Sequence, residues 1–92
     1  MRIELTDRFQ RDVRSLDRES RSAVFEALLS LPAAIGDVHR HAGLGLRKLH
    51  RSGIWEARIG LGLRIVFAMD RETCSFVRAG THDEIRRYLR SL

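Results

Sequence analysis

The period of the apolar residues changes once along this chain, and that change most constrains its fold. Between residues 6 and 31 apolar side chains recur at helical spacing, whereas between residues 46 and 79 they alternate with polar ones. Spacings of three and four residues indicate amphipathic helices, and a spacing of two indicates half-buried strands. We therefore expect helices that cover one face of a sheet.

The first third predicts a strand and two helices. Residues 2–5 alternate polar and apolar, which predicts a short strand. Thr6 is expected to cap the first helix and Asp17 the second, which Pro32 is expected to end. The buried stripe of the first helix is Phe9, Val13 and Leu16. The stripe of the second is Val24, Ala27, Leu28 and Leu31, widened by Phe25 and Leu29.

Short strands follow a glycine-containing loop over residues 32–45. The expected strands are residues 46–50, 54–59, 63–69 and 73–79. Turn signals separate the last three, and Gly80 is expected to end the last strand. Thr81 and Glu84 form a capping-box pattern, which predicts a final helix through Leu89.

These elements define an α+β fold in one domain, residues 1–92. The expected order is β-α-α-β-β-β-α, with three hairpin-linked strands as an antiparallel meander. The N-terminal helical hairpin covers one face of this sheet, and a short C-terminal helix follows it. The other face is left partly open, so functional groups are expected there.

Positive charge is concentrated in the middle of the chain. The net charge is +5, and residues 40–69 hold six cations against Glu56 alone, whereas residues 1–39 have a net charge of −1. Such concentration favours a polyanion or an acidic partner. The alternative is a basic surface without a dedicated role.

Two arginines are expected to face each other across a hairpin. If Gly60-Leu61-Gly62 is a three-residue turn, Arg58 pairs with Arg64 on the outer face of the sheet. Like charges directly opposite destabilise a sheet, but a bound phosphate would stabilise the pair because a guanidinium binds phosphate oxygens bidentately. Glu56 on the same face could instead bridge one of them, and a two-residue turn would break the pairing.

The preceding strand adds further basic residues. Because Leu49 is expected to be buried, Lys48 and His50 are expected to face outward, with Arg47 and Arg51 nearby. The candidates for phosphate contacts are thus Lys48, Arg47, His50 and Arg51. A solvated lysine on a sheet surface is the plainer interpretation.

His82 is the histidine most suited to proton transfer. It begins the capped final helix and precedes Asp83 and Glu84. The helix N-terminus disfavours the imidazolium, whereas the two acids favour it, and histidine changes charge near neutral pH. His82 could equally be an exposed residue at a helix start. Tyr88, about 600° further around the helix, could pack, contact a phosphate or stack on a base.

Metal and disulfide chemistry are not expected. His39 and His41 have no third ligand nearby, so a zinc site is not predicted, and no cofactor is expected. Cys74 is the only cysteine and cannot form an internal disulfide. With no signal peptide or membrane span in the sequence, we expect a cytoplasmic protein.

Three segments together resemble the RelE/ParE superfamily of toxins from bacterial toxin–antitoxin pairs. They are residues 45–50, residues 55–67 and residues 80–84. The second is similar to the family hairpin, aromatic-x-x-R-x-x-x-x-x-R-[IVL]-x-[YF]. The third is similar to the G-T-H-[SD]-E stretch of the YafQ-like ribonuclease branch. The resemblance covers nearly the whole chain in element order and size.

The resemblance implies cleavage of mRNA, usually on the ribosome and without a metal. Arg64 matches the strand arginine that contacts the scissile phosphate, and Arg58 matches a basic position one strand away. His82 matches the catalytic histidine of the YafQ-like branch. Tyr88 falls near the C-terminal tyrosine of RelE. Glu56 departs from the pattern because RelE has a lysine there.

The expected function is that of a toxin that cleaves mRNA and inhibits translation. Its expected partners are a small acidic antitoxin, mRNA and the ribosome. No association with a membrane is expected. One alternative is a ParE-like inhibitor of DNA gyrase without ribonuclease activity. Another is a basic binding domain that has no activity.

Overall fold

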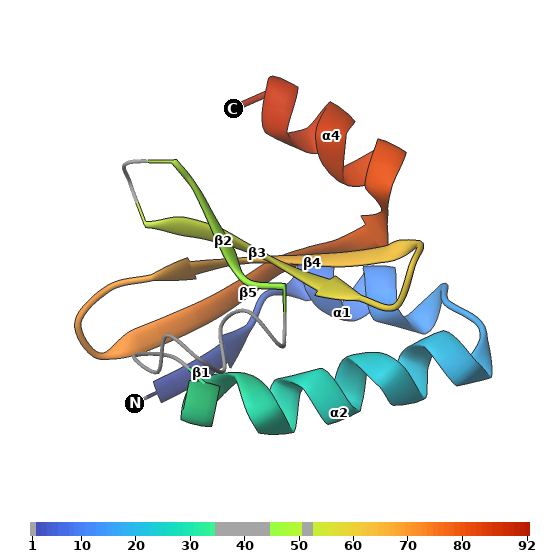
Figure 1. Ribbon diagram of the computed structural model, residues 1–92, viewed down its shortest axis with the longest axis horizontal. Helices are drawn as coiled ribbons and strands as arrows, with labels where there is room; N and C mark the ends of the chain where they lie inside the picture. Colours follow the sequence, from blue (N-terminus) through green and yellow to red (C-terminus); the bar gives the residue numbers. More distant parts are fainter. Residues whose placement is uncertain (1, 35–44, 51–52) are drawn as a thin grey trace.

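The computed structural model describes residues 2–34, 45–50 and 53–92, and this part of the chain forms a five-stranded sheet flanked by helices (Figure 1). The strands are β1 (Arg2–Leu5), β2 (Arg47–His50), β3 (Ile54–Ile59), β4 (Leu63–Met69) and β5 (Thr73–Thr81). The helices are α1 (Asp7–Arg14), α2 (Arg18–Ala34) and α4 (His82–Arg90). None of these helices is long and apolar enough to cross a membrane.

The sheet has the order β1-β5-β4-β3-β2. Strands β2 to β5 pair antiparallel, which confirms the meander, and the α+β class is confirmed. The strand expected at residues 46–50 is confirmed as β2, which pairs with β3, so the sheet has one strand more than the expected order β-α-α-β-β-β-α. The sheet is also mixed rather than antiparallel, because β1 pairs with β5 in parallel. No tight turn joins β1 to β5, so no hairpin imposes an antiparallel direction on them.

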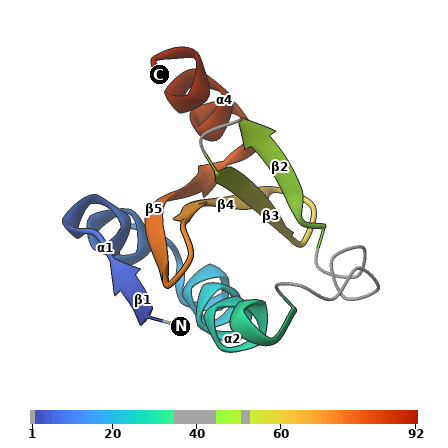
Figure 2. The same cartoon turned by 90° about the vertical axis from the view of Figure 1, so that its left-hand side faces the viewer.

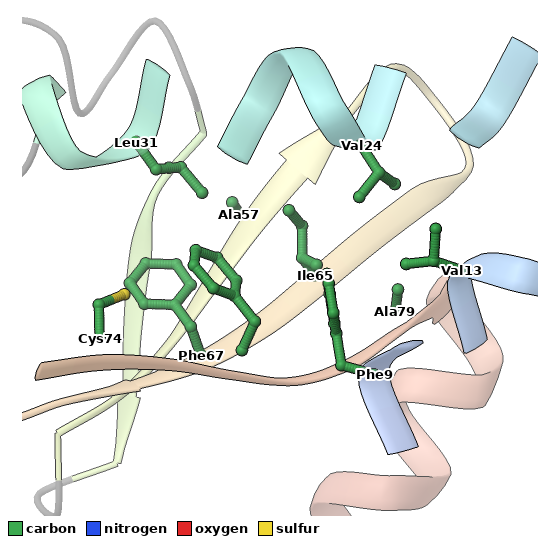
Figure 3. Close-up of a cluster of buried hydrophobic side chains, with 10 residues drawn as sticks. Phe9, Val13, Val24, Leu31, Ala57, Ile65, Phe67, Cys74 and Ala79 are labelled. Atoms are coloured by element: carbon green, nitrogen blue, oxygen red, sulfur yellow. The ribbon is translucent and has the colours of Figure 1, made fainter. Parts of the chain in front are cut away.

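Helices α1 and α2 lie on one side of the sheet, and the main core fills the space between these helices and the sheet (Figure 3). Its aromatic centre is Phe76, whose ring centroid lies 5.5 Å from that of Phe9 and 5.4 Å from that of Phe67. The predicted stripe of α1 is confirmed, since Phe9 and Val13 are buried and Leu16 packs against the core. The buried cluster consists of Phe9, Val13, Val24, Leu31, Ala57, Ile65, Phe67, Cys74, Phe76 and Ala79.

Helix α2 buries a narrower stripe than its composition predicts. Val24 and Leu31 are buried, but Phe25 and Leu29 are 54% and 84% exposed, so the widened stripe is wrong. A helix that lies over a sheet buries only the side facing the sheet, and these two residues are on its flank. The helix also continues past Pro32 to Ala34. Proline removes one backbone donor but keeps helical φ, so the last turn can include it.

The three predicted helix caps are confirmed. The hydroxyl of Thr6 accepts a hydrogen bond from the backbone N–H of Phe9 at 3.2 Å. The carboxylate of Asp17 accepts one from the backbone N–H of Ser20 at 2.7 Å. Thr81 and Glu84 form a reciprocal capping box at the start of α4. These bonds satisfy amide groups that the first turn of a helix leaves unpaired.

Strand β5 runs past the glycine that was expected to end it. Gly80 pairs with Arg64, and the strand continues to Thr81. A Cβ atom at Gly80 would lie 3.3 Å from both Cβ and Oε1 of Glu84, which is tighter than ordinary contact. Glycine at this position therefore allows the capping box to pack against the strand, and it does not break the strand.

Helix α4 lies on the side of the sheet opposite α1 and α2 (Figure 2). Val66 and Ile85 are buried, yet neither belongs to the main core. Val66 alternates with Ile65 and Phe67 along β4, so it faces the opposite side of the sheet. The chain enters α4 directly from β5, and this connection places the helix N-terminus beside the outer face of β4.

Candidate functional site

The β3–β4 hairpin holds Arg58 and Arg64 side by side. Its turn has three residues, because Ile59 pairs with Leu63, and Gly60 adopts a φ of 64°, which favours glycine. Arg58 therefore pairs directly with Arg64, as expected from the turn. Both side chains lie on the face of the sheet opposite the core residues Ala57 and Ile65.

The two arginines line a pocket of about 480 Å³ on that face. Polar and charged groups make up most of its lining. The described residues that line it are Gly45, Leu46, Arg47, Glu56, Arg58, Arg64 and His82. The pocket thus collects side chains from three neighbouring strands and the start of α4 at one point.

His82 reaches this pocket because of where β5 ends. Gly80 is opposite Arg64 in the sheet, and His82 follows it by two residues as the first residue of α4. The capping box of Thr81 and Glu84 fixes the direction in which the chain leaves the strand. His82 is exposed at the rim, so solvent and a ligand can both reach its imidazole.

Arg64 and Arg58 differ in their surroundings. Arg64 is 9% exposed, and its Nε lies 3.2 Å from Oε1 of Glu56. The contact is an ion pair without the alignment of a hydrogen bond, because Nε has no hydrogen-bond partner. Nη1 of Arg64 donates to the carbonyl of Leu63 at 3.1 Å. Arg58 is exposed and forms no ion pair with any residue that the structure describes.

Glu56 therefore forms an ion pair with Arg64. This ion pair is the alternative to a bound phosphate that the sequence left open. The carboxylate is 8% exposed, and its Oε2 also lies 3.9 Å from Nη2 of Arg47. The alternation of β3 predicts the correct face for Glu56, but Glu56 was not among the predicted site residues. The signal was its place two residues before Arg58 on the same side of β3.

The face assigned to Lys48 is wrong. Arg47 pairs with Glu56, so Arg47 shares the outer face with the pocket and lines it. Lys48 pairs with Trp55, whose ring stacks on Phe67 on the opposite face. An irregularity between Lys48 and His50 shifts the register, which strict alternation from Leu49 does not anticipate.

Two further RNA-binding candidates are only partly described. The backbone of His50 pairs with Ile54, but its side chain lies outside the described part of the structure, as does the whole of Arg51. The loop histidines His39 and His41 also lie outside the described residues. Within residues 2–34, 45–50 and 53–92, no three His, Cys, Asp or Glu side chains form a group that could hold a metal ion.

Tyr88 does not line the pocket. It is half-buried, and the guanidinium of Arg78 lies 5.2 Å from the centroid of its ring. Arg78 in turn donates from Nε to Oδ2 of Asp12 at 2.7 Å. Tyr88 therefore packs in a chain of contacts that joins α4, β5 and α1, and the structure does not bring it to His82.

The pocket has the groups that bind and stabilise a phosphate. Two adjacent guanidinium groups can each donate to phosphate oxygens, and a solvent-accessible imidazole beside them can accept or donate a proton. Because Arg64 is largely removed from water, its charge acts through a lower effective dielectric than that of an exposed side chain. The arrangement suits an anionic transition state at one end of the β3–β4 hairpin.

Solved structures with a similar fold are toxins and toxin–antitoxin complexes of the RelE/YafQ type. YafQ from E. coli is 20% identical, with a TM-score of 0.66 over 92% of this chain and 98% of that chain. A chain of the E. coli DinJ–YafQ complex is 17% identical, with a TM-score of 0.73 over 90% of this chain and 93% of that chain. The present chain thus has the RelE/YafQ toxin fold, as the sequence resemblance implied.

Among the more similar sequences is a chain of the toxin–antitoxin complex RelBE2 from Mycobacterium tuberculosis. It is 26% identical, with a TM-score of 0.61, and the alignment covers 88% of this chain and 96% of that chain. No protein-family model matches the sequence, and no curated protein matches it. The likeness is therefore carried by the three-dimensional structure over almost the whole length of each chain.

Proposed function

We propose that this chain is the toxin of a type II toxin–antitoxin pair and that it cleaves mRNA in association with the ribosome. The observation that carries the proposal is the convergence of Arg58, Arg64 and His82 on one pocket. The cross-strand arginine pair costs sheet stability; Glu56 offsets the charge of Arg64 only, and a bound phosphate would account for Arg58. The RelE/YafQ fold of the chain supports the same function.

The proposed reaction is phosphoryl transfer within the RNA strand. The ribose 2′-oxygen forms a bond to the adjacent phosphorus, and the bond from phosphorus to the 5′-oxygen breaks. The products are a 2′,3′-cyclic phosphate and a 5′-hydroxyl, so one proton leaves the 2′-hydroxyl and one reaches the 5′-oxygen. His82 exchanges one of these protons and solvent exchanges the other, and Arg58 and Arg64 stabilise the additional negative charge on the phosphoryl oxygens.

Arg47 is the best-placed residue for a flanking phosphate. It lines the pocket, and its side chain is 70% exposed, so it can move toward a ligand. Lys48 lies on the other face of the sheet. To contact it, a bound RNA would have to wrap around the edge of the sheet at β2. The charge that a metal ion would supply comes here from guanidinium groups, so a chelator should not slow the reaction.

The proposed partner is a small acidic antitoxin. The structures of similar fold include complexes that pair RelE with RelB and YafQ with DinJ. For the present chain, an acidic segment that covers the pocket would neutralise Arg47 and Arg58. Salt should therefore weaken the association, because ions screen exposed charges.

Brief expression in bacteria, followed by mapping of RNA 5′ ends and of DNA breaks, tests the proposal. New 5′ ends within mRNA, with intact chromosomal DNA, are expected together with arrested growth. DNA breaks with intact mRNA would overturn the ribonuclease and support a gyrase inhibitor. Unaffected growth with intact mRNA and DNA would leave a binding domain without toxicity.

A further inference from the structure

Glu56 is a buried carboxylate inside a pocket that is otherwise positively charged. Burying a carboxylate is unfavourable unless cations pair with it, and Glu56 has two such partners. Glu56 faces Arg47 across β2–β3 and reaches Arg64 on β4, and it is the one acidic residue among the described residues that line the pocket. Both of its partners line the phosphate site, so its charge acts on that site as well as on the fold.

The contacts of Arg64 show what this carboxylate does to the guanidinium. Nε faces Glu56 and Nη1 is bonded to the carbonyl of Leu63. Nη2 has no hydrogen-bond partner among the described residues, and it is not one of their buried unsatisfied atoms. Two of the three nitrogens are thus held by the protein, and the third remains available to a ligand.

Glu56 also lowers the affinity of the pocket for an anion. The described lining carries a net charge of two positive units, because three guanidinium groups stand against one carboxylate when the imidazole is neutral. A phosphate that contacts Arg64 must approach the carboxylate that already contacts it, and the two negative charges repel. The repulsion acts at least as strongly on the transition state, which carries additional negative charge, so the carboxylate can favour catalysis only through its hold on Arg64.

We propose that Glu56 is a positioning residue that holds Arg64 for catalysis, at the expense of weaker RNA binding. The proposal rests on the proposed function and adds a residue to the phosphate site. The carboxylate orients the guanidinium so that Nη2 meets the phosphoryl oxygens, and its charge opposes the singly charged phosphodiester.

The test compares Glu56→Gln with Glu72→Gln, which removes the same charge from an exposed turn at the other end of the β4–β5 hairpin. The binding probe is a short 2′-O-methyl RNA, which has no free 2′-hydroxyl and cannot be cleaved. Glu56→Gln should bind it roughly five- to tenfold more tightly than the wild type, because the nearby negative charge is gone. Glu72→Gln should bind it as the wild type does.

Turnover of cleavable RNA completes the test. We expect kcat of Glu56→Gln to fall roughly tenfold, because a neutral amide orients the guanidinium less firmly. Glu56→Asp keeps the charge but shortens the reach, so its kcat should also fall, without tighter binding. A purely structural residue would weaken binding and catalysis together and would lower the melting temperature.

Two results would overturn the role of Glu56. One is unchanged or weaker binding of 2′-O-methyl RNA by a folded Glu56→Gln protein. The other is a kcat equal to that of the wild type in both Glu56 variants. A wild-type protein that binds RNA but cleaves none contradicts the proposed ribonuclease instead, and the affinity comparison still decides the electrostatic role of Glu56 because it needs no cleavage.

Discussion

Arg58 and Arg64 are direct cross-strand partners on the outer face of β3 and β4, yet Arg58 is exposed whereas Arg64 is buried, with only 9% of its surface exposed. The buried member is held by Glu56 and by the carbonyl of Leu63. The exposed member lies free of ion pairs with the described residues. The pair therefore combines a fixed guanidinium with one that can move toward a ligand, at the expense of repulsion between them.

That repulsion predicts that Arg58 opposes stability while it supports activity. Arg58→Thr should leave the melting temperature unchanged or raise it by up to about 4 °C, because a like-charge pair is removed and threonine favours strands. RNA cleavage should fall at least tenfold. The matched control is Arg71→Thr in the exposed β4–β5 turn, which should keep full activity. A large loss of stability in Arg58→Thr would show that the arginine serves the fold.

The capping box at α4 predicts a pH dependence of stability. Hydrogen bonds from the backbone and side chain of Thr81, the backbone bond first, lower the pKa of Glu84 below its ordinary value of 4.5. A carboxyl with a depressed folded pKa stabilises the protein above the unfolded pKa, and this contribution is lost as pH falls through the folded pKa. Glu84→Gln should therefore be less stable than the wild type at pH 7, and the difference should shrink below pH 4.5.

Urea unfolding of Glu84→Gln and the wild type at pH 7 and pH 3.5 measures this difference. We expect a loss at pH 7 of about 0.5–1 kcal/mol, within the range for helix capping. Since the box also directs the chain at His82, the variant should cleave RNA more slowly as well. Equal destabilisation at both pH values would show that the carboxylate charge does not contribute.

Asp12 joins α1 to the outer side of β5. Its carboxylate accepts hydrogen bonds from Arg78 Nε at 2.7 Å, from the backbone N–H of Ala79 at 3.0 Å and from Arg8 Nε at 3.1 Å. Asp12→Ala should cost about 2–4 kcal/mol, because it leaves the partly buried Arg78 and an amide group unpaired. Glu26→Ala on the exposed side of α2 is the control for thermal unfolding and should change little.

Cys74 should be unreactive in the folded protein. It is completely buried, and burial raises the pKa of its thiol to about 11. The thiolate is the reactive form, so alkylation by iodoacetamide at pH 8 should be slow until the protein unfolds. Mass spectrometry with and without urea measures the two rates. Fast labelling without urea would mean that the core around Phe76 opens readily.

The sequence predicted those parts of the site that depend on local signals. Glycines on both sides of Leu61 indicate a three-residue turn, and that turn length alone pairs Arg58 with Arg64. The T-x-x-E pattern likewise located the start of α4 and with it His82. Both inferences need only a few neighbouring residues, so tertiary packing does not alter them.

Other parts depend on contacts that a single sequence does not reveal. The irregular register of β2 decides that Arg47 rather than Lys48 lines the pocket. Gly80 resembles a strand breaker, but its lack of a side chain makes room for Glu84. Glu56 on β3 is buried where it contacts Arg47 on β2 and Arg64 on β4. Sequence spacing does not predict how deeply such a side chain is buried.

If the pocket of Arg58, Arg64 and His82 cleaves RNA, primer extension on one abundant mRNA after brief induction should show the cuts. Wild-type protein and the Arg71→Ala control should produce the same new 5′ ends. Arg64→Ala should produce almost none, and His82→Ala should produce them roughly 10²–10⁴ times more slowly, the usual contribution of a proton-transfer residue. Undiminished cleavage by both folded variants would show that Arg64 and His82 do not carry out the reaction.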